Sequence, residues 1–165
     1  MKKIINLTIL IITSLLIVAC YKSKKSETMT TESNTSIFPK GEKLPNDWFT
    51  GNAFLTKFIS KDKNNEFSAG NVTFEPGART KWHTHPKGQV LIVLEGEGFY
   101  QEEGKPAQSI KKGDVVNIPE EVKHWHGASA ISKMAHIAIT NYKGDVQVTW
   151  LEPVNDATYN EINNQ

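Results

Sequence analysis

Residues 81–89 read Lys-Trp-His-Thr-His-Pro-Lys-Gly-Gln, and residues 123–126 read Lys-His-Trp-His. On a β-strand, side chains two residues apart point to the same face. His83 therefore projects together with His85, and His124 projects together with His126. Two such pairs facing one interior would bring up to four imidazoles within reach of one ion. Imidazole suits Zn, Fe, Ni and Cu, and also Mn when oxygen ligands complete the shell.

These histidines have a simpler interpretation, as hydrogen-bonded core residues or as surface residues of an open sheet. The chain has five histidines in all, and the fifth, His136, follows the two pairs. Two His-x-His pairs with another histidine behind them favour a metal site over that interpretation. Gln89 shares the odd numbering of the first pair, but it follows the turn at 86–88, so alternation alone does not place it.

The sequence around the histidines consists of short β-rich runs separated by Gly- and Pro-containing turns, without a sustained helical period. This pattern is typical of a sandwich or barrel. The run Val90–Leu94 is apolar at every position and predicts a central strand covered on both faces. The strands predicted are Trp48–Phe58, Asn71–Glu75, Lys81–His85, Val90–Glu95, Gly98–Glu102, Gln108–Ile110, Asp114–Ile118, Lys123–Ala128, Met134–Thr140 and Gln147–Leu151.

Two spaced motifs resemble the cupin family. The spacing Gly77-x5-His83-x-His85-x3-Gln89-x6-Gly96 is similar to the first cupin motif, with Gln in place of the common Glu. The spacing Gly113-x5-Pro119-x4-His124 is similar to the second, although Glu121 replaces its usual Gly and Ala128 its usual Asn. The resemblance implies an all-β cupin double-stranded β-helix, a jelly-roll barrel. It also implies one divalent metal ion held by three histidines and a glutamine: His83, His85, His124 and Gln89.

A closer resemblance runs through the segments 73–86, 123–128 and 134–138. They look like the small bacterial cupins of the carboxymuconolactone decarboxylase-associated group, which includes manganese-dependent hydroxynitrile lyases. That resemblance implies manganese as the cofactor, with Fe, Zn, Ni or Cu as the other candidates. It also implies active-site roles for His126, His136 and Thr80. The chain departs from those lyases at Lys81 and Thr140.

The function expected is therefore that of a metal-dependent enzyme acting on a small molecule, by lyase, decarboxylase-like or oxygenase chemistry. His126 and His136 would move protons, or they would only orient the metal ligands. The alternative is a non-catalytic cupin of the cell envelope that binds a metal or a small ligand. Five imidazoles in one cavity favour the enzyme. Arg79 and Lys81 share the numbering of His83 and could reach an anionic substrate, but a solvated position at the cavity mouth is favoured for Lys81. Trp125 should point to the outer face and pack there or in a dimer contact.

The N-terminus predicts export. Lys2 and Lys3 precede an apolar run over 4–18, and small residues lead to the single cysteine, Cys20. This order is typical of a secretory signal peptide, and a retained transmembrane anchor is the alternative. Ile17-Val-Ala-Cys20 resembles a bacterial lipobox, which implies cleavage before Cys20 and a lipid on its sulfur. We expect a signal peptide at 1–19, a lipidated cysteine and tether at 20–36 and a cupin domain at 37–165.

Charge and composition limit the classes of partner that the protein is expected to bind. The chain has 19 basic and 18 acidic residues and a net charge of +1, which is too balanced for a nucleic-acid-binding surface. The expected partners are a small-molecule substrate, a membrane reached through the lipid anchor and, by family resemblance, a second copy in a homodimer. The expected location is the cell envelope.

Overall fold

The computed structural model describes residues 36–164. The predicted signal peptide and Cys20 lie outside this range, so export and lipidation stay predictions. Within it, no helix is long and apolar enough to cross a bilayer.

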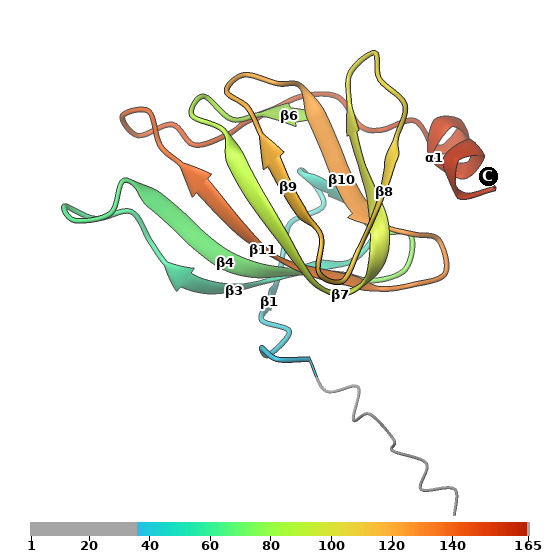
Figure 1. The fold of residues 1–165 in the computed structure, drawn as a ribbon, viewed down its shortest axis with the longest axis horizontal. Coiled ribbons are helices and arrows are strands. Elements are labelled where there is room, and N and C mark those ends of the chain that lie inside the picture. The colour runs from blue at the N-terminus through green and yellow to red at the C-terminus, as the bar shows by residue number, and fades with distance from the viewer. Residues whose placement is uncertain (1–35, 165) are drawn as a thin grey trace, which may run out of the picture. The chain divides into compact units, whose positions relative to one another are not determined.

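The described chain is built almost entirely of antiparallel strands, followed by one C-terminal helix (Figure 1). The elements are β1 Glu42–Lys43, β2 Phe49–Thr50, β3 Ala53–Ile59, β4 Phe67–Phe74, β5 Arg79–Thr80, β6 His83–Thr84, β7 Gln89–Glu102, β8 Gln108–Lys111, β9 Val115–Ile118, β10 His124–Ala128, β11 Met134–Asn141, β12 Thr149–Trp150 and α1 Asp156–Asn163.

The strand order β1-β3-β4-β11-β7-β10-β5-β2 describes one continuous sheet, to which β6, β8, β9 and β12 pair at the sides. Strand β7 curls this sheet, because its first half pairs with β11 and β9 and its second half with β10 and β8. Gly96 lies between the halves with φ of 70°. A Cβ there would come within 1.8 Å of the Lys133 carbonyl oxygen, so only glycine fits this bend.

Most predicted strands are present, with several differences, among them the short strands β1 and β5, which were not predicted. The predicted strands Val90–Glu95 and Gly98–Glu102 are one long strand, β7, since Gly96 bends the chain without ending it. The predicted strand Trp48–Phe58 is two strands, β2 and β3, separated at Gly51, where φ is 77°. Helix α1 was not predicted; Asn155 caps it by accepting a hydrogen bond from the Ala157 backbone N–H.

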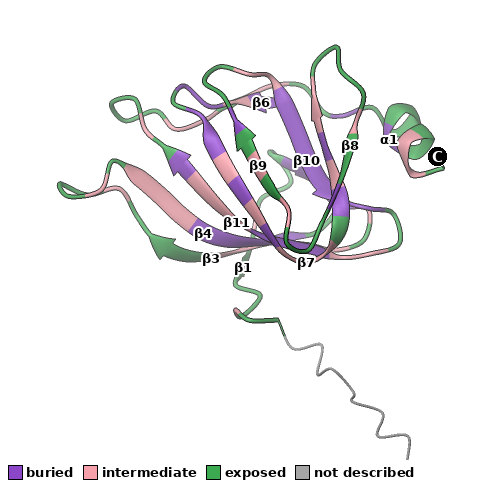
Figure 2. Cartoon of the chain, in the orientation of Figure 1, coloured by how far each residue is buried: buried purple, intermediate pink, exposed green. Residues whose placement is uncertain are grey.

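The main core lies on the concave face of the curled sheet. On β7, Leu91 and Val93 are buried, and they belong to one cluster with Phe74 from β4 and Ile118 from β9. Buried and partly buried positions alternate along β7 (Figure 2). The even-numbered residues of the run 90–94 are only partly buried. The prediction that this run is central is therefore confirmed, and the prediction that both its faces are fully covered is wrong.

A second apolar cluster lies on the outer face of β10, where Trp125 is fully buried against Tyr159 of α1. The Trp125 indole N–H donates to Gln101 Oε1 at 2.8 Å, and the Tyr159 hydroxyl donates to the Ala128 carbonyl at 2.7 Å. The expected outward direction of Trp125 is thus confirmed. The helix of the same chain provides its cover.

The structure contradicts the expectation that Arg79 could reach a substrate beside His83. Its guanidinium lies 4.2 Å from the centre of the Tyr159 ring and bonds to Asp156 and to the Val154 carbonyl, on the outer side of the sheet. Thr80, the next residue, faces the interior. The alternation along the chain is interrupted between β5 and β6, so the odd numbering shared by Arg79 and His83 does not give them the same face.

Candidate metal centre

Three histidines meet because β6 and β10 are paired with His124 directly opposite His83. His85 follows β6 and points to the same place. The ring centres lie 4.1 Å apart for His83 and His124, 5.0 Å for His83 and His85, and 5.4 Å for His85 and His124. One ring nitrogen from each lies within 4.8 Å of the others, and all three side chains are buried. We call these residues the histidine triad.

Backbone carbonyls set the tautomer of the triad. The Nδ1 atoms of His83, His85 and His124 lie 2.9, 2.6 and 2.8 Å from the carbonyl oxygens of Lys81, Gln147 and Val122. A carbonyl can only accept, so each Nδ1 carries the proton and each Nε2 keeps its lone pair. The Nε2 atoms of His85 and His124 are buried without a partner among the described residues. This pattern is typical of metal-binding histidines, whose second nitrogen donates to a carbonyl.

Gln89 begins β7 and is buried beside the triad, where it also lines the cavity described below. Its Nε2 donates to Thr140 Oγ1 at 2.8 Å, which orients the amide and leaves Oε1 buried with no partner among residues 36–164. A buried acceptor without a donor is unfavourable by about 1–3 kcal/mol. A cation at this place would satisfy Oε1 and the triad nitrogens together, so the donor set fits the predicted divalent metal.

The electrostatics of the triad also suit a cation. Burial lowers the pKa of His83 well below its usual 6.5, and the neighbouring imidazoles of His124 and His85 lower it further. Burial likewise lowers the pKa of His85, and that of His124 to about 4. All three are therefore neutral at pH 7, as metal ligands must be.

His126 and His136 lie next to the triad, from β10 and β11. Their ring centres are 4.9 Å apart, and His126 is 5.5 Å from His83. Both nitrogens of His136 and Nδ1 of His126 are buried without partners among the described residues. Burial lowers the pKa of His126 well below 6.5 and that of His136 to about 4. Thr80 Oγ1 accepts a hydrogen bond from the His126 backbone N–H at 3.1 Å.

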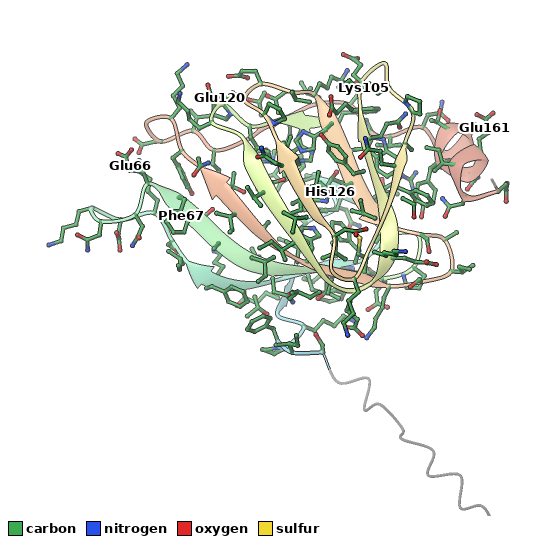
Figure 3. All side chains as sticks on the ribbon, in the orientation of Figure 1. Glu66, Phe67, Lys105, Glu120, His126 and Glu161 are labelled. Carbon is green, nitrogen blue, oxygen red and sulfur yellow. The ribbon has the colours of Figure 1, made fainter. Side chains whose placement is uncertain are left out.

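A cavity of about 500 Å³ opens onto this cluster. His126 lies inside the curl of the sheet, whereas Glu66, Lys105, Glu120 and Glu161 lie at its periphery (Figure 3). The predicted site residues that line the cavity are Thr80, His83, His85, Gln89, His126 and His136. Its walls are mostly apolar, formed in part by Leu44, Trp48, Phe49, Leu55, Val72 and Trp150. The structure thus gathers the predicted metal ligands with Thr80, His126 and His136, and adds Thr140, which orients Gln89. Lys81, like Arg79, does not line the cavity, and Cys20 lies outside the described residues.

The comparisons with known proteins agree with this architecture. A family description, "Cupin domain", matches residues 70–139. The crystal structure of a cupin-like protein from Thermotoga maritima is 45% identical, with a TM-score of 0.74 over 78% of this chain and 97% of its own. The chain belongs to the cupin family. The predicted jelly-roll barrel is thereby confirmed.

Two further relatives bear on this cupin differently. It is 44% identical over 117 residues to an (R)-mandelonitrile lyase of Granulicella tundricola, covering 71% of this chain and 89% of the relative. The crystal structure of a predicted oxalate decarboxylase from Thermotoga maritima is 21% identical, with a TM-score of 0.57 over 71% of this chain and 97% of its own. The second likeness supports the fold alone.

Metal-free cupin should lose stability as the pH falls below 6.5. The unfolded chain gains protons on its histidines near pH 6.5, whereas folded His124 and His136 take them up only near pH 4. Folding is therefore progressively disfavoured between these values, and for His136 the loss at pH 5 is ~2 kcal/mol. The free energy of unfolding of chelator-treated protein, measured in urea at pH 7.5 and at pH 5, gives this loss. His136→Leu should make the free energy of unfolding less dependent on pH. An unchanged pH dependence in this variant would contradict the prediction.

Proposed function

We propose that this cupin is a metal-dependent lyase that cleaves an aryl cyanohydrin into an aldehyde and hydrogen cyanide. The observation that carries the proposal is the buried histidine triad beside Gln89. His85 Nε2, His124 Nε2 and Gln89 Oε1 have no hydrogen-bond partner among the described residues, and the same holds for His126 Nδ1 and both ring nitrogens of His136. The similarity to an (R)-mandelonitrile lyase supports the choice of reaction. The apolar walls of the cavity, with Trp48 and Phe49, suit an aromatic substrate.

His83, His85, His124 and Gln89 would hold the ion, with Mn as the metal proposed. When bound, a divalent ion supplies Lewis acidity toward a substrate oxygen. All four protein ligands are neutral, so none of the formal +2 charge is cancelled by a carboxylate. Thr140 keeps the Gln89 oxygen turned toward the triad by accepting from its amide nitrogen.

In this proposal His126 receives a proton, and its position in the cavity wall next to His83 supports that role. A neutral imidazole can accept the proton of the substrate hydroxyl, and burial keeps His126 neutral. His136 stands behind it, with 4.9 Å between the ring centres. Two positive charges at that separation repel strongly, so the pair of neutral imidazoles takes up at most one additional proton.

The reaction is balanced by these groups. The hydroxyl proton passes to His126, the carbon–oxygen bond becomes a carbonyl, and the bond to the nitrile carbon breaks with its electron pair on cyanide. The proton held by His126 then passes to cyanide, which leaves as hydrogen cyanide. His126 returns to its neutral form, so no oxidant or further reactant is required.

The test is release of benzaldehyde from mandelonitrile. Mn-loaded protein should cleave it about a hundredfold faster than chelator-treated protein, and readdition of Mn should restore the rate. Raw affinity favours Cu and Zn over Mn, so loading is done in buffer freed of both. His124→Ala serves as the matched control. Equal rates for this variant and the loaded wild type would overturn the proposal.

A further inference from the structure

The cavity has a cationic side chain far from the triad. Lys57 lies on β3, whose inward-facing residues Ala53, Leu55 and Lys57 alternate, and both Leu55 and Lys57 line the cavity. In the sheet register, Lys57 pairs with Gly70 of β4, and Gly70 pairs with Ala138 of β11. Gly70 itself is covered by Leu55, because a Cβ on Gly70 would lie 2.7 Å from Leu55 Cδ1.

Nothing in the cavity neutralises this lysine. Among the described residues no acidic group forms an ion pair with Lys57, whereas nearby Lys61 is paired with Asp145 at 3.0 Å. The residues that line the cavity include no Asp and no Glu. Because the triad and Gln89 are neutral too, a bound divalent ion would add further positive charge at the other end. The cavity therefore favours a ligand with negative charge.

The distance between Lys57 and the metal centre indicates the length of that ligand. Strand β3 is separated from β7, which carries Gln89, by β4 and β11. Three strand spacings of ~4.8 Å place the backbones ~14 Å apart along the sheet, and the curl and the long lysine side chain shorten the gap. The apolar side chains of Leu55 and Val72 also line the cavity that contains Lys57 and Gln89. An aromatic ring with oxygen groups at opposite ends would fit this span.

From these observations, we infer that Lys57 binds a carboxylate on the far end of the substrate. The substrate class is then an aryl cyanohydrin, and its aldehyde product, that carries a carboxylate para to the reacting carbon. This inference rests on the proposed function for the reacting end, but recognition of the carboxylate does not depend on turnover. Lys57 is exposed at the cavity mouth, so its contribution should be moderate, about fivefold in affinity.

Binding of two product analogues tests the inference without catalysis. Calorimetry on Mn-loaded protein compares 4-formylbenzoate with benzaldehyde, which lacks the carboxylate. Lys57→Met should weaken 4-formylbenzoate about fivefold and leave benzaldehyde unchanged, and Lys57→Glu should weaken the anion further. The matched control is Lys111→Met, an exposed lysine on β8 that does not line the cavity. Higher salt should reduce the difference between the two ligands.

The outcomes separate this inference from the proposed reaction. Equal affinities of the wild type for the two aldehydes, or equal losses for both in Lys57→Met, would overturn the role of Lys57 whatever the lyase assay shows. A preference for the anion that depends on Lys57, in a protein that does not cleave mandelonitrile, would support Lys57 and remove the lyase.

Discussion

Alanine in place of His124 is expected to reduce tightly bound divalent metal from one ion per chain to nearly none. The His124 Nε2 is buried without a partner among the described residues, and its Nδ1 is fixed by the Val122 carbonyl. Loss of an orienting partner alone weakens metal affinity about 10- to 100-fold, so loss of a ligand should exceed that. Elemental analysis after gel filtration in metal-free buffer measures the remaining ion.

His136→Ala is the matched control, because it also removes a buried imidazole but leaves the triad and Gln89 intact. It should retain the metal, and circular dichroism should show both variants folded. A His124→Ala protein that still holds one ion per chain would remove His124 from the proposed ligand set. Loss of metal from both variants would instead assign the effect to general disruption of the interior.

The triad could be predicted from the sequence because strand alternation and one register are enough to define it. His83 and His124 are directly opposite each other in the pairing of β6 with β10, and His85 needs only the same face. Gln89 could not be placed in this way, since it follows a turn. At that turn Gly88 has φ of 72°, and a Cβ there would lie 2.6 Å from the Ile118 carbonyl oxygen. The approach of β9, which is distant in sequence, thus sets the position of Gln89.

The errors have the same origin in contacts between distant segments. Arg79 was expected near the substrate from its numbering, but the interruption between β5 and β6 turns it toward Tyr159. Helix α1 has eight residues and only one buried side chain, Tyr159, so it carries little helical periodicity. Trp125 and the Ala128 carbonyl, both on β10, hold it in place. Thr140 was expected on the same strand face as His136 and was noted as a departure from the related lyases, but its bond to Gln89 required the register of β11 with β7.

Leucine in place of His126 is expected to lower the kcat for mandelonitrile about 10²- to 10⁴-fold while the metal stays bound. Leucine keeps most of the bulk but cannot accept a proton. The His126 Nδ1 has no partner among the described residues, so the substitution strands no hydrogen-bond donor there. The bond from the residue 126 backbone N–H to Thr80 does not depend on the side chain and should remain.

The distinction between proton transfer and support of the ligands then rests on two measurements made together. Single-turnover rates give the chemical step, and elemental analysis of the same sample gives the metal content. A rate that falls with full metal occupancy means that His126 moves the proton. Because His126 adjoins His83, with 5.5 Å between the ring centres, a purely supporting role would show first as lost metal. Lost metal with an unchanged rate per bound ion would therefore remove His126 from the chemistry and leave it as support for the triad.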